Sequence, residues 1–163
     1  MIILGIDPGL ATVGYGIIEK KGPDLKPVDY GVIQTPKEES TAVRLAILDE
    51  QLTALIKKFK PDCVAVEELF FNTNAKTAIM VAEGRGVILL ASIRECGRLY
   101  EYTPLQIKSA LTGNGRAEKA QVQYMVRAIL KIAKPIRPDD AADALAAAVC
   151  HANTNQALKD NKI

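Results

Sequence analysis

The sequence has no tryptophan, a single histidine and only three cysteines among its 163 residues. A single histidine, His151, excludes a zinc site built on several histidines, and any Ser-His-Asp triad would have to use it. Cys63, Cys96 and Cys150 are far apart, odd in number and set in apolar segments, a pattern typical of buried, reduced cysteines. The chemical groups that remain are carboxylates, lysines and backbone amides.

The small net charge and the short apolar runs argue against a strongly basic domain, a membrane-spanning protein and a secreted protein. With 21 Lys+Arg and 19 Asp+Glu the net charge is only +2, so the chain lacks the strong basic character of many nucleic-acid-binding domains. The longest apolar run, residues 87–93, is far shorter than the roughly 20 residues of a membrane-spanning helix. Residues 1–6 are apolar, but Asp7 interrupts them and no basic residues precede them, so we expect no signal peptide. We therefore expect a cytoplasmic protein without a membrane segment.

The alternation of segments predicts an α/β fold. Short connections between the first three strands favour an antiparallel meander, whereas a helical crossover makes the last two strands parallel. We expect one five-stranded mixed sheet with helices on both faces, formed by a single domain over residues 1–153, and a polar tail over 154–163. The predicted strands are 1–7, 14–20, 28–35, 63–67 and 98–102, and the predicted helices are 40–59, 75–96, 104–111, one opening near 119, and 139–152.

Carboxylates end the two most apolar predicted strands. Asp7 closes the first and Glu67 the fourth, while strand alternation places Glu67 and Glu68 on opposite faces. Ligand sites in open α/β sheets gather at the carboxyl ends of strands, so Asp7 and Glu67 are expected to lie close together. Two structural alternatives stay open, a turn residue for Asp7 and a solvated strand exit for Glu67.

Another acidic group opens the last predicted helix. Asp140 and Asp143 are three residues apart and share a helix face, whereas Asp139 points elsewhere and can cap the helix after Pro138. Acidic residues also suit a helix N-terminus on electrostatic grounds alone. The surrounding alanines favour close approach of this helix to the sheet.

Four ionised carboxylates in one place would repel each other unless cations compensate them. Oxygen ligands without histidine or cysteine suit Mg²⁺ or Mn²⁺. Two such ions can activate water and stabilise the leaving oxygen of a phosphoryl displacement. The acidic residues therefore predict a metal-dependent phosphodiesterase.

Five motifs occur in order along the chain and carry a family resemblance. Over about residues 1–152 the sequence resembles the RuvC family of bacterial crossover-junction endodeoxyribonucleases. Each motif is weak alone, but their order and spacing are specific. The motifs are ILGIDPG at 3–9, GYG at 14–16, AVE at 65–67 with Phe70 following, GNGRAEK at 113–119, and DAADAL at 140–145.

The resemblance implies an RNase H-like homodimer that resolves Holliday junctions by two symmetric nicks during DNA recombination and repair. It also implies branch-migration proteins as partners and two Mg²⁺ ions per subunit, with Mn²⁺ as a substitute. The family's catalytic and metal-binding acids fall on Asp7, Glu67, Asp140 and Asp143; some members have histidine at the third position. The family's aromatic residue beside the site falls on Phe70, and its DNA-contacting lysines fall on Lys108 and Lys119.

A DNA surface should appear as local positive charge. Lys108, Arg116 and Lys119 lie in or beside the 113–119 loop, whose glycines and following helix N-terminus suit phosphate. Asn74 and Lys76 are further candidate phosphate contacts. A basic stretch continues at Arg127, Lys131, Lys134 and Arg137, although a solvated helix face has the same pattern.

Phe70 is the residue that we expect to stack on an unpaired base, and the role of Phe71 stays open, since both could be core residues.

Small residues in the predicted 75–96 helix, including Gly84 and Gly86, favour close helix contact. That contact is either a dimer interface or burial within the monomer.

Three other functions share some of these sequence features. An actin-like ATPase has a similar Asp-Pro-Gly phosphate loop, but 163 residues are too few for its two lobes. An RNase H-like nuclease acting on RNA is disfavoured by the 113–119 and 140–145 motifs. A non-enzymatic junction-binding protein is disfavoured because all four metal positions hold carboxylates.

Overall fold

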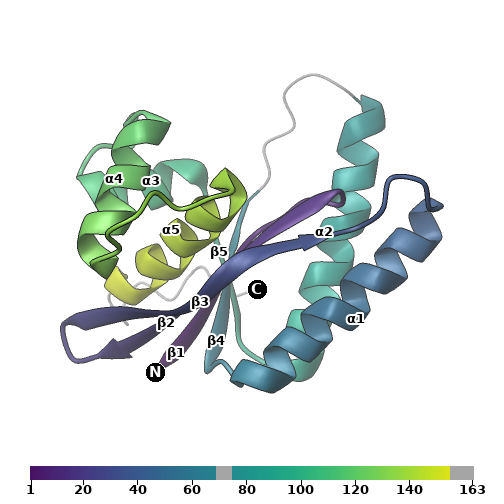
Figure 1. The fold of residues 1–163 in the computed structure, drawn as a ribbon, viewed down its shortest axis with the longest axis horizontal. Helices are drawn as coiled ribbons and strands as arrows, with labels where there is room; N and C mark the ends of the chain where they lie inside the picture. Colours follow the sequence, from purple (N-terminus) through teal and green to yellow (C-terminus); the bar gives the residue numbers. More distant parts are fainter. Residues whose placement is uncertain (69–74, 155–163) are drawn as a thin grey trace.

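A computed structural model describes residues 1–68 and 75–154, without the side chains of 75–77. Strands and helices form three layers, with the sheet in the middle (Figure 1). The predicted tail lies outside the described residues apart from Thr154. In chain order the elements are β1 (Ile2–Asp7), β2 (Thr12–Lys21), β3 (Asp24–Gln34), α1 (Thr41–Phe59), β4 (Cys63–Glu67), α2 (Ala75–Glu95), β5 (Leu99–Tyr102), α3 (Pro104–Thr112), α4 (Lys119–Leu130) and α5 (Asp139–Asn153).

The sheet has the strand order β3-β2-β1-β4-β5. β1 and β3 each pair antiparallel with β2, whereas β1, β4 and β5 are mutually parallel, as the connection lengths predicted. β2 and β3 are longer than predicted because their ladder continues to Lys21 and Asp24 around a tight turn. Gly22 makes this turn with a φ of 59°, a conformation that costs glycine little.

The residues predicted to start helices do so in the structure for α1 and α3, but not for α5. The Ser40 side chain caps α1 by accepting from the backbone N–H of Val43. Thr103 and Gln106 form a capping box at the start of α3. At α5 the prediction is wrong by one residue, because Pro138 is the N-cap and Asp139 is already helical.

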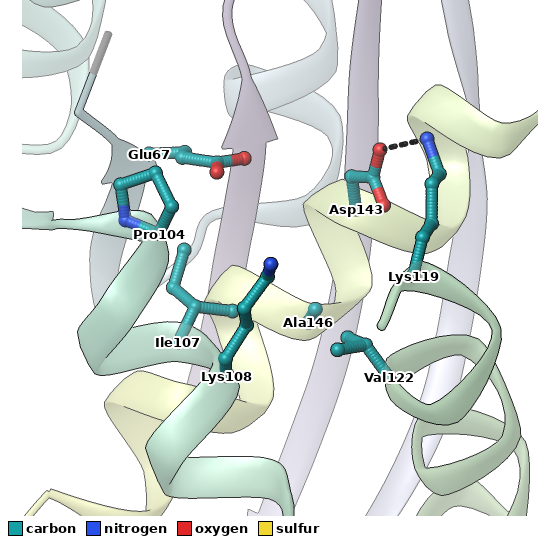
Figure 2. A pocket seen from close by; sticks show the side chains of 8 residues that line it. All are labelled: Glu67, Pro104, Ile107, Lys108, Lys119, Val122, Asp143 and Ala146. Carbon is teal, nitrogen blue, oxygen red and sulfur yellow. Dashed lines mark hydrogen bonds and ion pairs between the residues drawn. The ribbon is translucent and has the colours of Figure 1, made fainter. Parts of the chain in front are cut away.

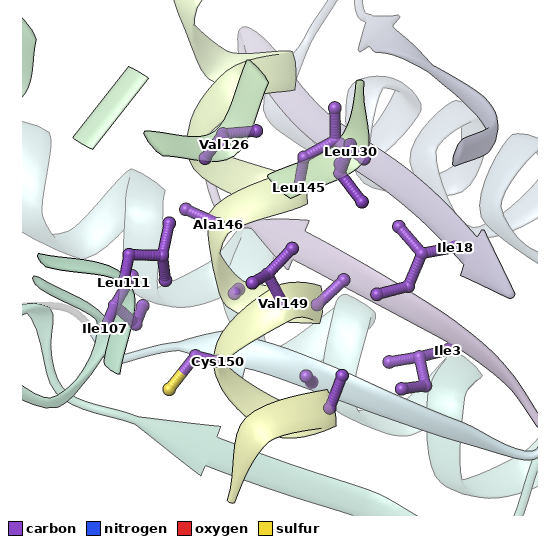
Figure 3. Close-up of a cluster of buried hydrophobic side chains, with 14 of the residues drawn as sticks. Ile3, Ile18, Ile107, Leu111, Val126, Leu130, Leu145, Ala146, Val149 and Cys150 are labelled. Carbon is purple, nitrogen blue, oxygen red and sulfur yellow. The ribbon is translucent and has the colours of Figure 1, made fainter. Parts of the chain in front are cut away.

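The two helical layers cover opposite faces of the sheet. α1 and α2 pack on one face, while α3, α4 and α5 lie on the other (Figure 1). Alternation along β1 divides its side chains accordingly: Ile3 joins the core under α5, and Leu4 and Ile6 join the core under α1 and α2. Figure 3 shows the first of these cores, in which Leu145 and Val149 of α5 point toward the sheet and the neighbouring helices.

Glycines let α5 lie unusually close to the strands. A Cβ atom at Gly5 would overlap the carbonyl oxygen of Ala144, and one at Gly14 would overlap the carbonyl oxygen of Asp140. Gly14 is paired with Asp7 in the β1–β2 ladder. This close packing therefore sets the first turn of α5 directly over the end of β1.

The cysteines are all free, and Cys63 and Cys150 are buried as predicted, whereas Cys96 is only partly buried. Burial raises the pKa of the Cys63 and Cys150 thiols to about 12, which keeps them unreactive. In the described parts of the chain, no helix is long and apolar enough to cross a membrane.

Candidate active site

Asp7 and Glu67 lie at equivalent ends of neighbouring parallel strands. The β1–β4 register pairs Ile6 with Val66, so Asp7 and Glu67 follow at the same edge of the sheet. Both residues are partly buried, because the sheet surrounds their backbones and α5 covers one face. The placement agrees with the expectation from the sequence that these two carboxylates are neighbours.

α5 brings the other two predicted acids to the same place. Asp140 and Asp143 occupy its first turns, and the backbone of Asp140 touches the strand at Gly14. The charges of Asp140 and Asp143 both raise the pKa of Asp7, so the strand and helix carboxylates lie close enough to interact electrostatically. We call Asp7, Glu67, Asp140 and Asp143 the acidic cluster.

In the metal-free protein, the carboxyl group of Asp7 favours its protonated form. Burial is the main reason that the pKa of Asp7 rises from 3.8 to about 8, and the negative charges of Glu67, Asp143 and Asp140 add to it. Lys119 acts in the opposite direction. A site with a buried carboxylate and three like charges beside it is one that a cation would stabilise.

The pKa of Glu67 is also raised. Burial, followed by repulsion from Asp143, raises the pKa of Glu67 from 4.5 to about 7. The positive charges of Lys119 and Lys108 partly offset this rise. Strongly perturbed carboxylates in a cleft are a physical mark of a functional site.

A pocket of about 190 Å³ opens beside the acidic cluster. Figure 2 shows Glu67 on one side and Asp143 on the other, with the ammonium of Lys108 pointing toward the space between them. Two acids and two lysines thus share one concave surface with an apolar wall. The lining residues are Glu67, Pro104, Ile107, Lys108, Lys119, Val122, Asp143 and Ala146.

Lys119 bridges from α4 to α5. Its Nζ donates to Asp143 Oδ2 over 2.8 Å and lies 3.8 Å from Asp139 Oδ2. The bond to Asp143 is the main reason that the pKa of Lys119 is raised, so the ammonium stays charged. From the sequence we expected the Asp139 side chain to point away from the site. In the structure Asp139 and Asp143 are one helical turn apart and both face Lys119.

The loop before α4 delivers Lys119 to the cluster. Gly113 ends α3 with a φ of 73°, and Asn114 Oδ1 then accepts from the backbone N–H of Arg116. Gln121 Oε1 accepts from the backbone N–H of Glu118, while Ala117 is buried. These contacts fix the entry into α4, so the helix begins at Lys119 with its side chain aimed at α5.

The predicted DNA-contacting residues do not all meet at the pocket. Lys108 and Lys119 line it, whereas Arg116 is exposed and lies outside its lining. Phe70, Phe71 and Asn74 lie outside the described residues, as does the Lys76 side chain. Ile107, Val122 and Ala146 line the pocket without having been predicted, since their apolar spacing indicates only core packing.

The carboxylate oxygens of the acidic cluster are ligands that suit a hard divalent cation, but they do not converge on one point in this structure. Among residues 1–68 and 75–154, no three His, Cys, Asp or Glu side chains converge closely enough to hold one ion. Instead, Asp143 is engaged by Lys119, and two carboxylates carry raised pKa values. Oxygen donors whose repulsion is only partly neutralised suit Mg²⁺ or Mn²⁺.

A five-stranded mixed sheet flanked by helices, with carboxylates gathered where β1, β4 and α5 meet, defines an RNase H-like protein. A profile of the crossover junction endodeoxyribonuclease RuvC family matches residues 3–151. The chain belongs to the RuvC family.

Individual relatives agree with this assignment. The crossover junction endodeoxyribonuclease RuvC of Petrotoga mobilis is 54% identical over 160 residues, which are 98% of each chain. The structure of Thermus thermophilus RuvC is similar over the whole of both chains, with 35% identity and a TM-score of 0.89. A second structure of that protein, in complex with a Holliday junction substrate, also has a TM-score of 0.89, at 32% identity over both chains.

Proposed function

We propose that this protein is a crossover-junction endodeoxyribonuclease that resolves Holliday junctions during homologous recombination and DNA repair. The observation that carries the proposal is the acidic cluster, assembled from β1, β4 and α5 in a member of the RuvC family. A Thermus thermophilus relative with the same fold has been solved with a Holliday junction substrate. The substrate is therefore four-way junction DNA.

Asp7, Glu67, Asp140 and Asp143 would hold the metal, for which we propose two Mg²⁺ ions per subunit, with Mn²⁺ able to substitute. When bound, the ions supply activation of water and charge stabilisation at the departing oxygen of the phosphodiester. Asp7 is central to the set, because the charges of the other three acids all converge on it. Asp140 stands where some family members have histidine.

Lys108 and Lys119 orient the scissile phosphate. Both line the pocket beside Glu67 and Asp143, so a phosphate entering there meets a positive charge from α3 and another from α4. Ile107, Val122 and Ala146 form a wall that limits the water in contact with these charges. We also assign DNA contacts to Arg116, Asn74 and Lys76, and base stacking to Phe70.

Two symmetric nicks require two active sites, and α2 offers a surface for a homodimer. Ile79, Leu90 and Ile93 are exposed to 61%, 58% and 44%. With the exposed Gly86 and Glu83 they form one stripe at helical spacing, which is apolar except for Glu83. We propose that this stripe packs against the same stripe of a second copy, as isologous contacts require.

The remaining assignments follow from this function. We propose that residues 1–153 form a single RNase H-like nuclease domain, that the protein acts in the cytoplasm, and that branch-migration proteins of the recombination pathway are partners. None of these assignments involves a membrane.

A synthetic immobile four-way junction incubated with Mg²⁺, with nicks mapped on all four strands, tests the proposed function. We expect two nicks, symmetric about the crossover, that a DNA ligase can reseal. A linear duplex of the same sequence is the control and should stay intact. Absence of nicks with both Mg²⁺ and Mn²⁺, or equal cutting of the duplex, would overturn the proposal.

A further inference from the structure

A second polar hollow lies on the outer side of α4. It encloses about 130 Å³ and forms where the connection between α4 and α5 runs back beside α4 (Figure 1). This hollow, here called the α4 pocket, is distinct from the pocket beside the acidic cluster, since the two share no lining residue. Its lining residues are Ala120, Gln123, Tyr124, Arg127, Pro135, Ile136 and Arg137.

The lining of the α4 pocket contains hydrogen-bond donors and positive charge. Its charged lining residues are two arginines, Arg127 and Arg137. The side-chain Nε2 of Gln123 is buried and has no hydrogen-bond partner among the described residues. A buried donor without an acceptor costs free energy, so an acceptor that reached Gln123 Nε2 would stabilise the structure.

The arginines are held in place by local bonds. Arg127 donates from Nε to the carbonyl of Ile132 and from Nη2 to the carbonyl of Ala133, which fastens the α4–α5 connection to α4. Arg137 Nη1 lies 2.6 Å from Asp139 Oδ1. Arg127 is therefore held in place before any ligand arrives, which lowers the entropy lost on binding, whereas the Arg137 side chain is 74% exposed and restrained by its pair with Asp139.

A chain of alternating charges joins the α4 pocket to the acidic cluster. Arg137 bonds to Asp139, whose other oxygen lies 3.8 Å from Lys119 Nζ, and Lys119 in turn bonds to Asp143. In sequence, Ala120 of the pocket lining follows Lys119 directly. An anion in the α4 pocket is thus close enough to belong to the same molecule as a phosphate at Lys119.

From this continuity we propose that the α4 pocket binds a backbone phosphate of the junction strand that enters the active site, at a position other than the scissile one. The inference rests on the proposed function, because it takes DNA to be the substrate. An acidic peptide of a partner protein would meet the same donors, but it would not need to continue toward Lys119. DNA is favoured for that reason.

Tyr124 supports the same occupant. Its side chain is 67% exposed and borders both the α4 pocket and a wider hollow whose lining includes Asn114 and Gln121. An aromatic ring that borders both hollows suits a sugar-phosphate chain, which can place a phosphate in the α4 pocket and pack a sugar on the ring. Tyr124 is a DNA-contacting residue in this arrangement.

Gln123→Glu is the sharpest test because it replaces the buried Nε2 donor with a carboxylate oxygen of nearly the same shape. Gln51→Glu makes the same change on the exposed surface of α1, across the sheet, and is the matched control. The measurement is the fluorescence anisotropy of a labelled four-way junction in EDTA, over a range of salt concentrations. We expect Gln123→Glu to weaken binding about tenfold or more and Gln51→Glu to leave it unchanged.

Arg137→Gln is the second variant, in case Gln123→Glu fails to fold as judged by its melting temperature. Losing one phosphate contact should reduce the slope of log K against log salt by about 0.9. Junctions carrying a single neutral methylphosphonate should then locate the contact. One position should weaken wild-type binding and have no further effect on Arg137→Gln, as expected for two partners of one contact.

The outcomes separate the two proposals. If wild type neither binds nor nicks the junction, the proposed function fails and the pocket inference falls with it. If wild type binds and nicks, but both pocket variants bind like Gln51→Glu, the α4 pocket does not contact DNA and only this inference is overturned.

Discussion

Lys119 Nζ lies 2.8 Å from Asp143 Oδ2, so a lysine from α4 neutralises a carboxylate of the acidic cluster. The ion pair crosses from one helix to the next and includes a hydrogen bond from Lys119 Nζ to Asp143 Oδ2. Under the proposed function, a cation bound at Asp143 would compete with this ammonium for the carboxylate in the DNA-free protein. A phosphate at the site would then attract Lys119 away from Asp143.

Lys119→Met should consequently bind metal more tightly and cleave more slowly. Removing a partly exposed competing charge should tighten Mn²⁺ binding roughly two- to fivefold, and losing a charge beside the phosphate should slow nicking about 10²-fold. Electron paramagnetic resonance of Mn²⁺ measures the first effect without DNA. Lys37→Met, at an exposed position in the loop before α1, should change neither. Unchanged Mn²⁺ affinity in Lys119→Met would contradict the competition.

Asp7→Asn should abolish nicking while leaving junction binding intact. Loss of an outer partner of a metal ligand typically costs about 10–100-fold, so removal of the central carboxylate should cost more. Asp24→Asn, on the exposed end of β3, is the control. Cleavage assays and anisotropy in EDTA separate the two properties. Cleavage at the wild-type rate would exclude Asp7 from the catalytic set.

The stability of the metal-free protein should fall as the pH rises. The pKa of Asp7 is about 8 in the fold against 3.8 for the free side chain, so its favourable contribution is present at low pH and is lost as pH rises toward 8. Glu67 acts in the same direction up to about pH 7. Thermal melts in EDTA should show a shallower decline for Asp7→Asn, and Mg²⁺ should restore wild-type stability at high pH. Parallel declines for the two proteins would refute the assignment.

Gly14→Ala should destabilise the fold and lower activity together. The added methyl group overlaps the Asp140 carbonyl, so α5 must move away from β2 and carry its acids with it. Overpacking of this kind costs about 1–3 kcal/mol in unfolding free energy. Gly31→Ala, in the neighbouring strand β3, meets only the movable Tyr15 side chain and should cost less. Chemical denaturation compares the two, and equal losses would show that the close approach of α5 is unimportant.

Leu90→Asp should dissociate the proposed homodimer. The carboxylate would be buried in the apolar stripe of α2, next to its own symmetry mate. Val28→Asp is the control, because Val28 is also exposed, to 46%, but lies on β3. Sedimentation equilibrium should give a dimer for wild type and the control and a monomer for Leu90→Asp. A wild-type protein that stays monomeric at micromolar concentration would rule out this interface.

Much of the fold could be predicted because its signals are local. Apolar runs ending in Asp7 and Glu67 mark the central strands, and Ser40 and Thr103 mark helix starts through their own side-chain bonds. Connection lengths were enough to predict which strands run parallel. The one-residue error at α5 arose because Asp139 is an excellent capping residue in isolation, whereas the proline before it takes that position.

By itself, the sequence determined the order of the strands and helices, the RuvC family resemblance and the four candidate acids, since these depend on residue type and spacing along the chain. The tertiary structure alone decided that Lys119 reaches Asp143 and lies near Asp139, that Arg116 stays outside the pocket, and that Gly14 brings α5 onto β2. The reason is physical. The pairing of charges and the burial of carboxylates depend on how separate elements pack, and no local pattern contains the distance between two elements.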